Sequence, residues 1–202
     1  MTEHNHIHRD DEGGKLGMWI FLFTELFLFG GLFLVYAVLR IKYSDAFHHA
    51  ASGLNTFIGT LNTVILLTSS MTVAMALSAI QKGNKKFATR LLIVTLILAA
   101  AFMVNKYFEW EHKFEINLYP GSEVIFNLER GEGLFYGLYY MMTGLHALHV
   151  VIGMVLLTIA VFKVRSGSIH STDYLLLENS GLYWHLVDLI WIFLFPLLYL
   201  IT

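Results

Sequence analysis

The last apolar stretch of the chain, Gly181 to Thr202, constrains the fold most, because it is long enough to cross a bilayer and still carries ionisable side chains. It reads GLYWHLVDLIWIFLFPLLYLIT. His185 and Asp188 lie about one helical turn apart, so in a helix both project from one face. An ionisable side chain at membrane depth costs roughly 2.5 to 3.5 kcal/mol even on a lenient insertion scale. Both are therefore expected to face protein, water or lipid headgroups, and the rest of the chain to supply their partners.

The composition places the chain among membrane proteins. Of its 202 residues, 56% are hydrophobic and only 14% are charged, which is more apolar material than one soluble core of this size buries. The apolar runs show no strict alternation and contain few prolines, which favours helices over barrel strands. The absence of cysteine excludes disulfides and thiolate metal ligands. The sequence predicts an all-α, polytopic membrane protein.

Five apolar runs are long enough to be transmembrane helices. The second is the richest in hydroxyl and amide groups, with Asn62, Thr63, Ser69 and Ser70, as is typical of a helix surrounded by others. Polar segments at 40–54 and 109–133 are expected to lie outside the membrane. We therefore predict a polar tail at 1–15 and one membrane domain at 16–202, with helices at about 16–39, 55–80, 91–108, 134–164 and 181–202.

Lysine and arginine are shared unequally between the two sides of this arrangement. Eight of them fall on the side of the N-terminus, namely Arg9, Lys15, Lys82, Lys85, Lys86, Arg90, Lys163 and Arg165. Five fall opposite, namely Arg40, Lys42, Lys106, Lys113 and Arg130. Because cytoplasmic loops are enriched in these residues, we predict an N-terminus inside and a C-terminus outside a bacterial cytoplasmic membrane. No basic surface suggests a nucleic-acid partner.

Histidines and acids within the apolar runs are the candidates for chemistry. His146 and His149 are spaced like His185 and Asp188, so two helices could offer facing pairs that bind a transition metal if they converge. Two histidines could also hold a haem. Intramembrane His and Asp more often hydrogen-bond helices together, and the Glu-x-x-His motifs of two-metal carboxylate sites are missing. We therefore predict no metal site in this chain.

For Glu25, in contrast to these histidines and Asp188, a functional role is favoured over helix packing. A carboxyl near the middle of an apolar helix needs pairing, protonation or solvation, so its presence indicates a functional role. Smaller acidic features, such as Glu109 after the third apolar run, can be solvated charges.

Four segments together resemble subunit III of the haem-copper terminal oxidases, in a five-helix form that lacks the two leading helices of longer members. In chain order they are GMWIFLFTELFLFGGLF at 17–33, LNTVILLTSS at 61–70, TGLHALHVVIG at 143–153 and ENSGLYWHLVDLIWIFLF at 178–195. The resemblance covers most of the chain from Gly17 onward, and the combination of motifs is highly specific.

The resemblance implies an accessory subunit without redox centres of its own or catalytic residues. It would dock on the catalytic subunit I and other oxidase subunits, which hold haem and copper and reduce oxygen to water. The family binds phospholipid in a cleft between two groups of helices, supports proton uptake and protects the catalytic site during turnover.

Residue by residue, Glu25 matches the family's intramembrane glutamate and His149 a histidine near bound lipid. A pair of family glutamates is only half kept, because Lys106 stands in the first position and Glu109 in the second. The rest of the polar signature is matched by His146, Glu178, His185 and Asp188.

Two other functions remain open from the sequence. The accessory proteins of nitric oxide reductases share similar helices, so the partner could reduce nitric oxide. An autonomous proton-coupled transporter could use Glu25, His149 and His185 as a relay, although neither an inverted repeat nor broken helices support it. The sequence leaves the electron donor, haem type and bound lipid undetermined.

Overall fold

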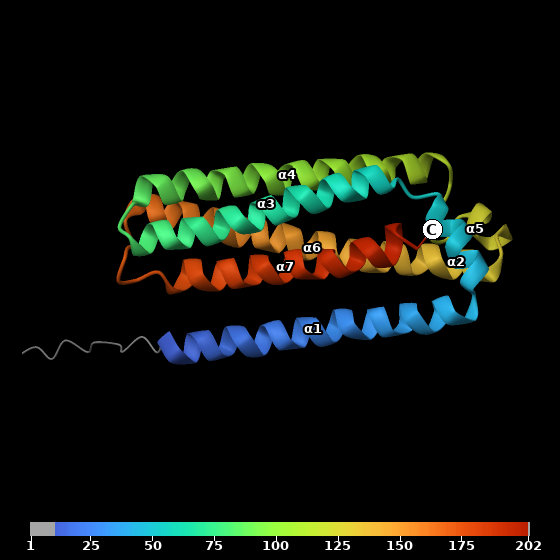
Figure 1. Cartoon of the computed structure of the whole chain (residues 1–202), viewed down its shortest axis with the longest axis horizontal. Coiled ribbons are helices and arrows are strands. Elements are labelled where there is room, and N and C mark those ends of the chain that lie inside the picture. The colour runs from blue at the N-terminus through green and yellow to red at the C-terminus, as the bar shows by residue number, and fades with distance from the viewer. Residues whose placement is uncertain (1–10, 202) are drawn as a thin grey trace, which may run out of the picture.

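The computed structural model describes residues 11–201 of the chain, and its fold is all-α (Figure 1). Two short helices, α2 (Ser44–Ser52) and α5 (Glu123–Asn127), accompany five long ones. Each long helix is long and apolar enough to cross a membrane, which confirms the predicted bundle of five transmembrane helices. The long helices are α1 (Asp11–Lys42), α3 (Thr56–Gln81), α4 (Lys85–Glu115), α6 (Arg130–Ser166) and α7 (Leu175–Tyr199).

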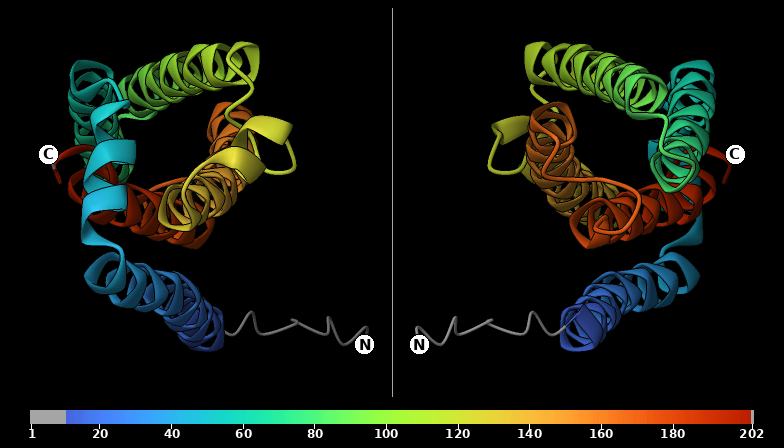
Figure 2. Two further views of the ribbon diagram at one scale, coloured as in Figure 1. Left: turned by 90° about the vertical axis from the view of Figure 1, so that its right-hand side faces the viewer. Right: turned by 90° about the vertical axis from the view of Figure 1, so that its left-hand side faces the viewer.

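Four of the long helices form a bundle and the fifth lies outside it. In the end-on views of Figure 2, α3, α4, α6 and α7 surround a common centre, and each contacts the next. Helix α1 packs on the outside of this bundle, against α6 and α7. Its span is the least buried of the five, so most of its apolar surface faces outward.

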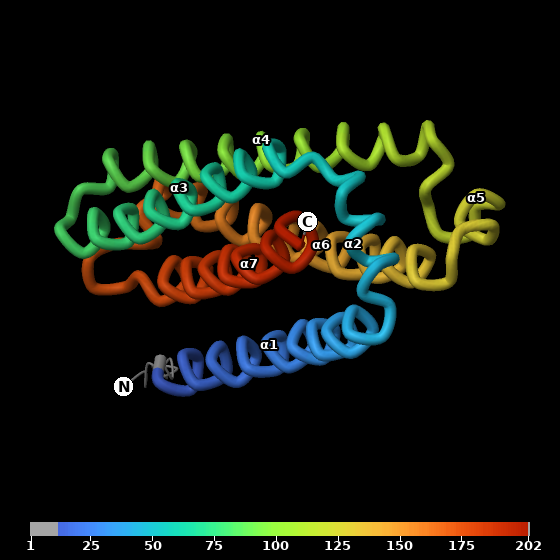
Figure 3. Tube along the Cα trace, turned by 45° about the vertical axis from the view of Figure 1, so that its right-hand side comes forward, coloured from blue at the N-terminus to red at the C-terminus, as the bar shows by residue number. Residues whose placement is uncertain are grey.

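The two ends of the bundle differ in structure. The start of α1, the α3–α4 turn and the α6–α7 connection lie together at one end, which we call the basic end (Figure 1). The other end, which we call the α2 end, carries α2, α5 and the last described residues (Figures 1 and 3). Each long helix therefore crosses the molecule once.

Most of the polar segment at 40–54 is helical and not an irregular loop. Helix α2 occupies most of it, with Ala46, Phe47, Ala50 and Ala51 buried along one face. These apolar residues recur at helical spacing, so the short helix is held by packing although polar residues fill its other face. The Phe47 ring lies edge-on to the ring of Phe135 on α6, with 5.4 Å between centroids.

Helix α4 extends well beyond the predicted range of 91–108. It begins at Lys85 and continues to Glu115, so seven residues of the predicted polar excursion are helical. The physical reason is that Lys106, Glu109 and Lys113 lie on one buried face, where they find partners inside the bundle. The other long helices also outrun their predicted bounds at one or both ends, because polar residues continue the helices past the apolar runs.

The start of the chain also differs from its prediction. Part of the predicted tail at 1–15 is helical, because α1 begins at Asp11, while residues 1–10 lie outside the described part. At the other terminus α7 ends at Tyr199, before the predicted bound of 202.

Close helix contacts occur at glycines that a motif search would not choose. A Cβ on Gly153 of α6 would lie 2.7 Å from the Trp184 ring of α7, and one on Gly59 of α3 would lie 2.8 Å from the Phe195 ring. The GxxxG pair of Gly133 and Gly137 makes no such approach. Small residues at these two contacts let the bundle helices approach closely.

The hydroxyl-rich helix α3 is held to α7 by tryptophans. The indole Nε1 of Trp184 donates to Ser69 Oγ at 3.0 Å, and that of Trp191 donates to Thr63 Oγ1 at 3.0 Å. On its other side, α3 meets α4 through Asn62, whose Oδ1 accepts from Asn105 Nδ2 at 2.8 Å. These bonds satisfy polar groups that lipid would leave unpaired.

Candidate functional site

Glu25 of α1 meets His149 of α6 within the spanning part of the molecule. Oε2 of Glu25 lies 2.8 Å from Nε2 of His149, and the side chains are 16% and 7% exposed respectively. The contact forms because α1 packs against α6, which brings together residues 124 positions apart. Glu25 therefore has a partner from the protein, while its side chain stays partly exposed.

The geometry indicates how many protons this pair carries and where one of them lies. Nδ1 of His149 lies 2.8 Å from the backbone carbonyl oxygen of Leu145, which can only accept, so Nδ1 carries a hydrogen. The contact between Nε2 and Glu25 then needs one more proton, which belongs either to the carboxyl or to the imidazole. In both arrangements the pair is neutral overall, which limits the cost of placing two ionisable groups at membrane depth.

Aromatic rings pack around the histidine of the pair. The His149 ring lies edge-on to Phe29 at 5.4 Å and parallel to Tyr183 at 6.3 Å between centroids. Phe21, one turn before Glu25, stacks with Tyr183 at 6.0 Å between ring centroids. These contacts exclude water from the imidazole and hold its ring in a single orientation.

The other candidate groups do not converge with this pair. His146 is buried between Phe102 and Trp191, and neither of its ring nitrogens has a hydrogen-bond partner. His185 lies 2.7 Å from Ser70 Oγ on α3 through its Nδ1. Asp188 is buried, and neither of its oxygens accepts a well-formed hydrogen bond.

The sequence analysis considered whether His146 and His149 of α6 could face His185 and Asp188 of α7 and bind a transition metal. Among residues 11–201, the structure contains no group of three or more His, Asp or Glu residues placed to hold a metal ion. The two histidines of α6 point to different neighbours, one toward α1 and the other toward α4 and α7.

A second cluster of charged groups lies buried near the α2 end. Nζ of Lys106 donates to Oε2 of Glu109 at 3.1 Å, and both residues are less than 10% exposed. The other oxygen of Glu109 accepts from the hydroxyls of Tyr139 and Tyr199, each at 2.6 Å. Lys106 contacts the same two hydroxyls at 3.2 and 3.0 Å, so the cluster links α4, α6 and α7.

From the sequence, Glu109 had no evident partner and could have been a charge exposed to solvent. One signal was available, because Lys106 and Glu109 are spaced by three and so share a helix face. The two tyrosines lie on other helices, and nothing in their local sequence marks them as partners. Lys113 adds a third buried charge, with its Nζ 5.6 Å from the centre of the Tyr136 ring.

Glu178 lies at the opposite end. Its carboxylate contacts Nζ of Lys15 at 3.0 Å, and both side chains are partly exposed, so the contact joins the starts of α7 and α1 at the basic end. Glu178 is therefore remote from the pair formed by Glu25 and His149.

Comparison with known proteins shows the family. A sequence model of the cytochrome c oxidase subunit III family matches residues 2–202. The chain belongs to the cytochrome c oxidase subunit III family. It is 30% identical to cytochrome c oxidase subunit 3 of Thermostichus vulcanus, over 98% of this chain and 92% of that relative. It is also 30% identical to cytochrome bo(3) ubiquinol oxidase subunit 3 of Pseudomonas aeruginosa, over 98% of this chain and 90% of that relative.

Another relative bears on the partner of this subunit III. Heme-copper oxidase subunit I+III of Aeropyrum pernix matches 93% of this chain at 30% identity, while the match spans 22% of the relative. The name of that relative combines subunits I and III. The chain is an accessory subunit of a haem-copper oxidase, as the resemblance of its motifs suggested.

Proposed function

We propose that this subunit III supports proton uptake by the catalytic subunit and prolongs its activity during turnover, with Glu25 and His149 as the working pair. The contact of 2.8 Å between Oε2 and Nε2 carries the proposal. A proton can sit on either partner without changing the net charge, so the pair can relay or store one without creating an isolated charge in the membrane. The partial exposure of Glu25 gives it access to the surrounding surface.

The proposal includes phospholipid beside this pair. Leu148 and Ile152 are exposed on α6 next to His149, and α1 exposes Leu26 next to Glu25. Acyl chains lying along such apolar surface would limit the access of water to Glu25. Mild-detergent purification of the complex, followed by lipid extraction, should recover less phospholipid after Leu148→Ser than after Leu200→Ser, an equally exposed control at the α2 end.

Oxygen reduction belongs, in this proposal, to the haem and copper of the partner subunit. Relatives of this chain are named as subunits of cytochrome c and ubiquinol oxidases, which supports an oxidase partner over a nitric oxide reductase. The spectrum and metal content of the catalytic subunit that co-purifies with the chain test this step. Haem with copper would support it, and haem with non-haem iron would refute it.

The orientation is also a proposal, with the basic end on the inner side of the membrane. Two of the five cations that the sequence analysis assigned to the outer side, Lys106 and Lys113, are buried in the bundle and do not belong to loops. Leaving them out of the comparison strengthens the bias of exposed cations toward the basic end. Cysteine labelling at position 167 against position 121, both in connections, distinguishes the two orientations.

The central test replaces Glu25 in the assembled oxidase. Glu25→Gln keeps the side-chain size but provides no carboxyl to exchange a proton, so we expect slower proton uptake or fewer turnovers before inactivation. Glu178→Gln is the matched control, because it makes the same chemical change at the basic end. If an assembled Glu25→Gln enzyme matches both the control and the parent in uptake and lifetime, the proposed role is wrong.

A further inference from the structure

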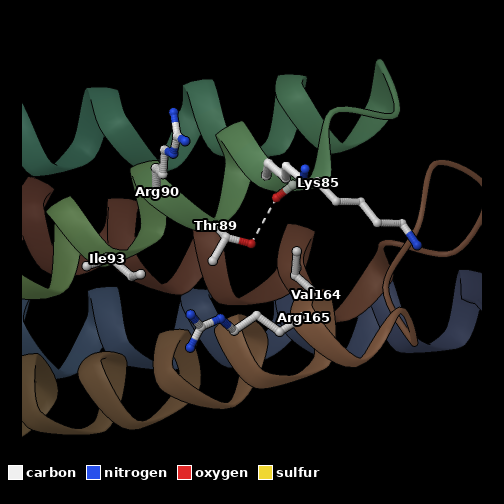
Figure 4. Close-up of a pocket in the computed structure, with 7 residues that line it drawn as sticks. Lys85, Thr89, Arg90, Ile93, Val164 and Arg165 are labelled. Carbon is white, nitrogen blue, oxygen red and sulfur yellow. Dashed lines mark hydrogen bonds between the residues drawn. The ribbon is translucent and has the colours of Figure 1, made fainter.

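A basic cavity lies between α4 and α6 at the basic end of the molecule (Figure 4). It has a volume of about 360 Å³ and opens to the surface. Its charged lining consists of Lys85, Lys86, Arg90 and Arg165, and no acidic side chain lines it. Within the described part of the chain, none of these four cations belongs to an ion pair. The cavity therefore concentrates positive charge that the protein leaves uncompensated.

The cations come from both helices and line the cavity from different sides, with the Arg90 side chain turned away from Arg165 in Figure 4. In Figure 4, the side chain of Arg165 extends from α6 below Thr89 and Ile93 of α4. Lys85 begins α4 and reaches toward the connection that follows α6, since its Nζ lies 3.6 Å from the position of a Cβ on Gly167. The positive N-terminal end of the α4 dipole points to the same side. An anion in the cavity would thus meet positive charge from two directions.

The depth of the cavity matches the headgroup region of a bilayer. Helix α4 has 31 residues, so at 1.5 Å per residue it is about 46 Å long, against roughly 30 Å for a hydrocarbon core. Because its apolar stretch begins only at Leu91, the polar turns before it are expected to lie outside the hydrocarbon. Lys85, Lys86 and Arg90 all fall within these turns.

The wall toward the middle of the membrane is apolar, which favours a lipid over a free anion. Ile93 lines the cavity, and Ile97 follows it one turn later on the same face of α4; both are exposed. On α6, Phe162 is exposed one turn before Arg165. A free phosphate would use only the cations, whereas a phospholipid would use both the cations and this apolar surface.

We propose that this cavity binds the phosphate headgroup of an anionic phospholipid whose acyl chains lie along the exposed faces of α4 and α6. The site goes beyond the function proposed above and does not depend on it. Arg165 lies 16 residues after His149 on α6, a separation of about 24 Å along the helix. The pair of Glu25 and His149 also lies between α1 and α6, whereas the cavity lies between α4 and α6, so the two proposed lipid sites are separate.

The test measures lipid binding to the full chain in detergent micelles by native mass spectrometry, with added phosphatidylglycerol or phosphatidylcholine. We expect the unmodified chain to retain phosphatidylglycerol preferentially. Lys85→Gln combined with Arg165→Gln should weaken that binding by roughly 10- to 30-fold, because each cation near an anionic headgroup is worth about one factor of five. The control combines Lys82→Gln with Lys163→Gln, which removes two exposed cations from the same end but outside the cavity.

Three results would overturn the proposal. One is equal retention of phosphatidylcholine, which would show that the headgroup charge is not recognised. Another is equal loss of phosphatidylglycerol in the control variant, which would indicate a general charge effect. The third is displacement of phosphatidylglycerol by inorganic phosphate at equimolar concentration, which would make the cavity a site for a free anion. Circular dichroism of each variant shows whether the helices are intact, and Arg165→Lys should restore most of the binding if charge is what the site needs.

Discussion

The buried cluster of Lys106 and Glu109 leads to a prediction whose magnitude follows from its hydrogen bonds. Removing one member of a buried ion pair leaves the other charge uncompensated, which typically costs about 3 to 5 kcal/mol. Glu109→Gln leaves the Lys106 ammonium with only neutral partners, so we expect a loss of about 3 to 5 kcal/mol in unfolding free energy. Lys106→Met should cost less, about 2 to 3 kcal/mol, because Glu109 keeps two tyrosine donors.

The double variant distinguishes pairing from packing. If the two residues act as a pair, Lys106→Met combined with Glu109→Gln removes both charges of the contact and leaves Lys113 as the buried charge nearby. The tyrosine hydroxyls can still donate to the glutamine oxygen. We expect a total loss of about 1 to 3 kcal/mol, well below the sum of the two single losses. The corresponding coupling energy would be about 4 to 5 kcal/mol.

The assay is reversible unfolding of the purified chain in mixed micelles, followed by circular dichroism as the fraction of denaturing detergent rises. The midpoint and slope give the change in unfolding free energy for each variant. Two single losses that add within about 0.5 kcal/mol, or single losses below about 1 kcal/mol, would refute the reasoning. Either result would mean that water or micelle headgroups solvate the cluster.

Three further predictions use the same unfolding assay. Gly153→Ala should cost about 1 to 3 kcal/mol, because its Cβ would lie 2.7 Å from an indole ring of α7, whereas Gly30→Ala, in open space, should be neutral or slightly stabilising. Thr63→Val should cost about 1 to 3 kcal/mol and shift tryptophan fluorescence, because Nε1 of Trp191 loses its acceptor. Asp188→Asn should change the unfolding free energy by less than about 1 kcal/mol, because its oxygens have no well-formed hydrogen bond to lose; a loss above 3 kcal/mol would contradict this.

The transmembrane helices could be predicted from the sequence because the hydropathy of their residues adds up along each apolar run. Some twenty apolar residues in succession outweigh local detail, so the five spans were found. The helix ends were missed where charged residues continue a helix, as Lys106, Glu109 and Lys113 do in α4. A hydropathy reading places such residues in loops, since it contains no information on the tyrosines of other helices that bury them.

The candidate site was only partly readable for a related reason. The sequence indicates that Glu25 needs a partner at membrane depth, but three histidines in apolar runs were available to it. Choosing His149 over His146 or His185 depends on which face of α6 turns toward α1. That rotation is set by packing at sites such as Gly153, where the helix contacts the indole of Trp184.

Three carboxyl groups of the spanning helices, those of Glu25, Glu109 and Asp188, can be ordered by how firmly the protein holds them. Glu109 accepts from three donors on three helices, Glu25 contacts one imidazole, and Asp188 has no well-formed hydrogen bond. A carboxylate fixed by three donors is costly to protonate, because protonation weakens all three bonds, so Glu109 suits the stabilisation of helix packing. Glu25 contacts an imidazole that can itself accept a proton, and its side chain is partly exposed. By this reasoning a proton-linked role belongs to Glu25, and Glu109→Gln should alter stability while leaving the proton uptake of the assembled enzyme unchanged.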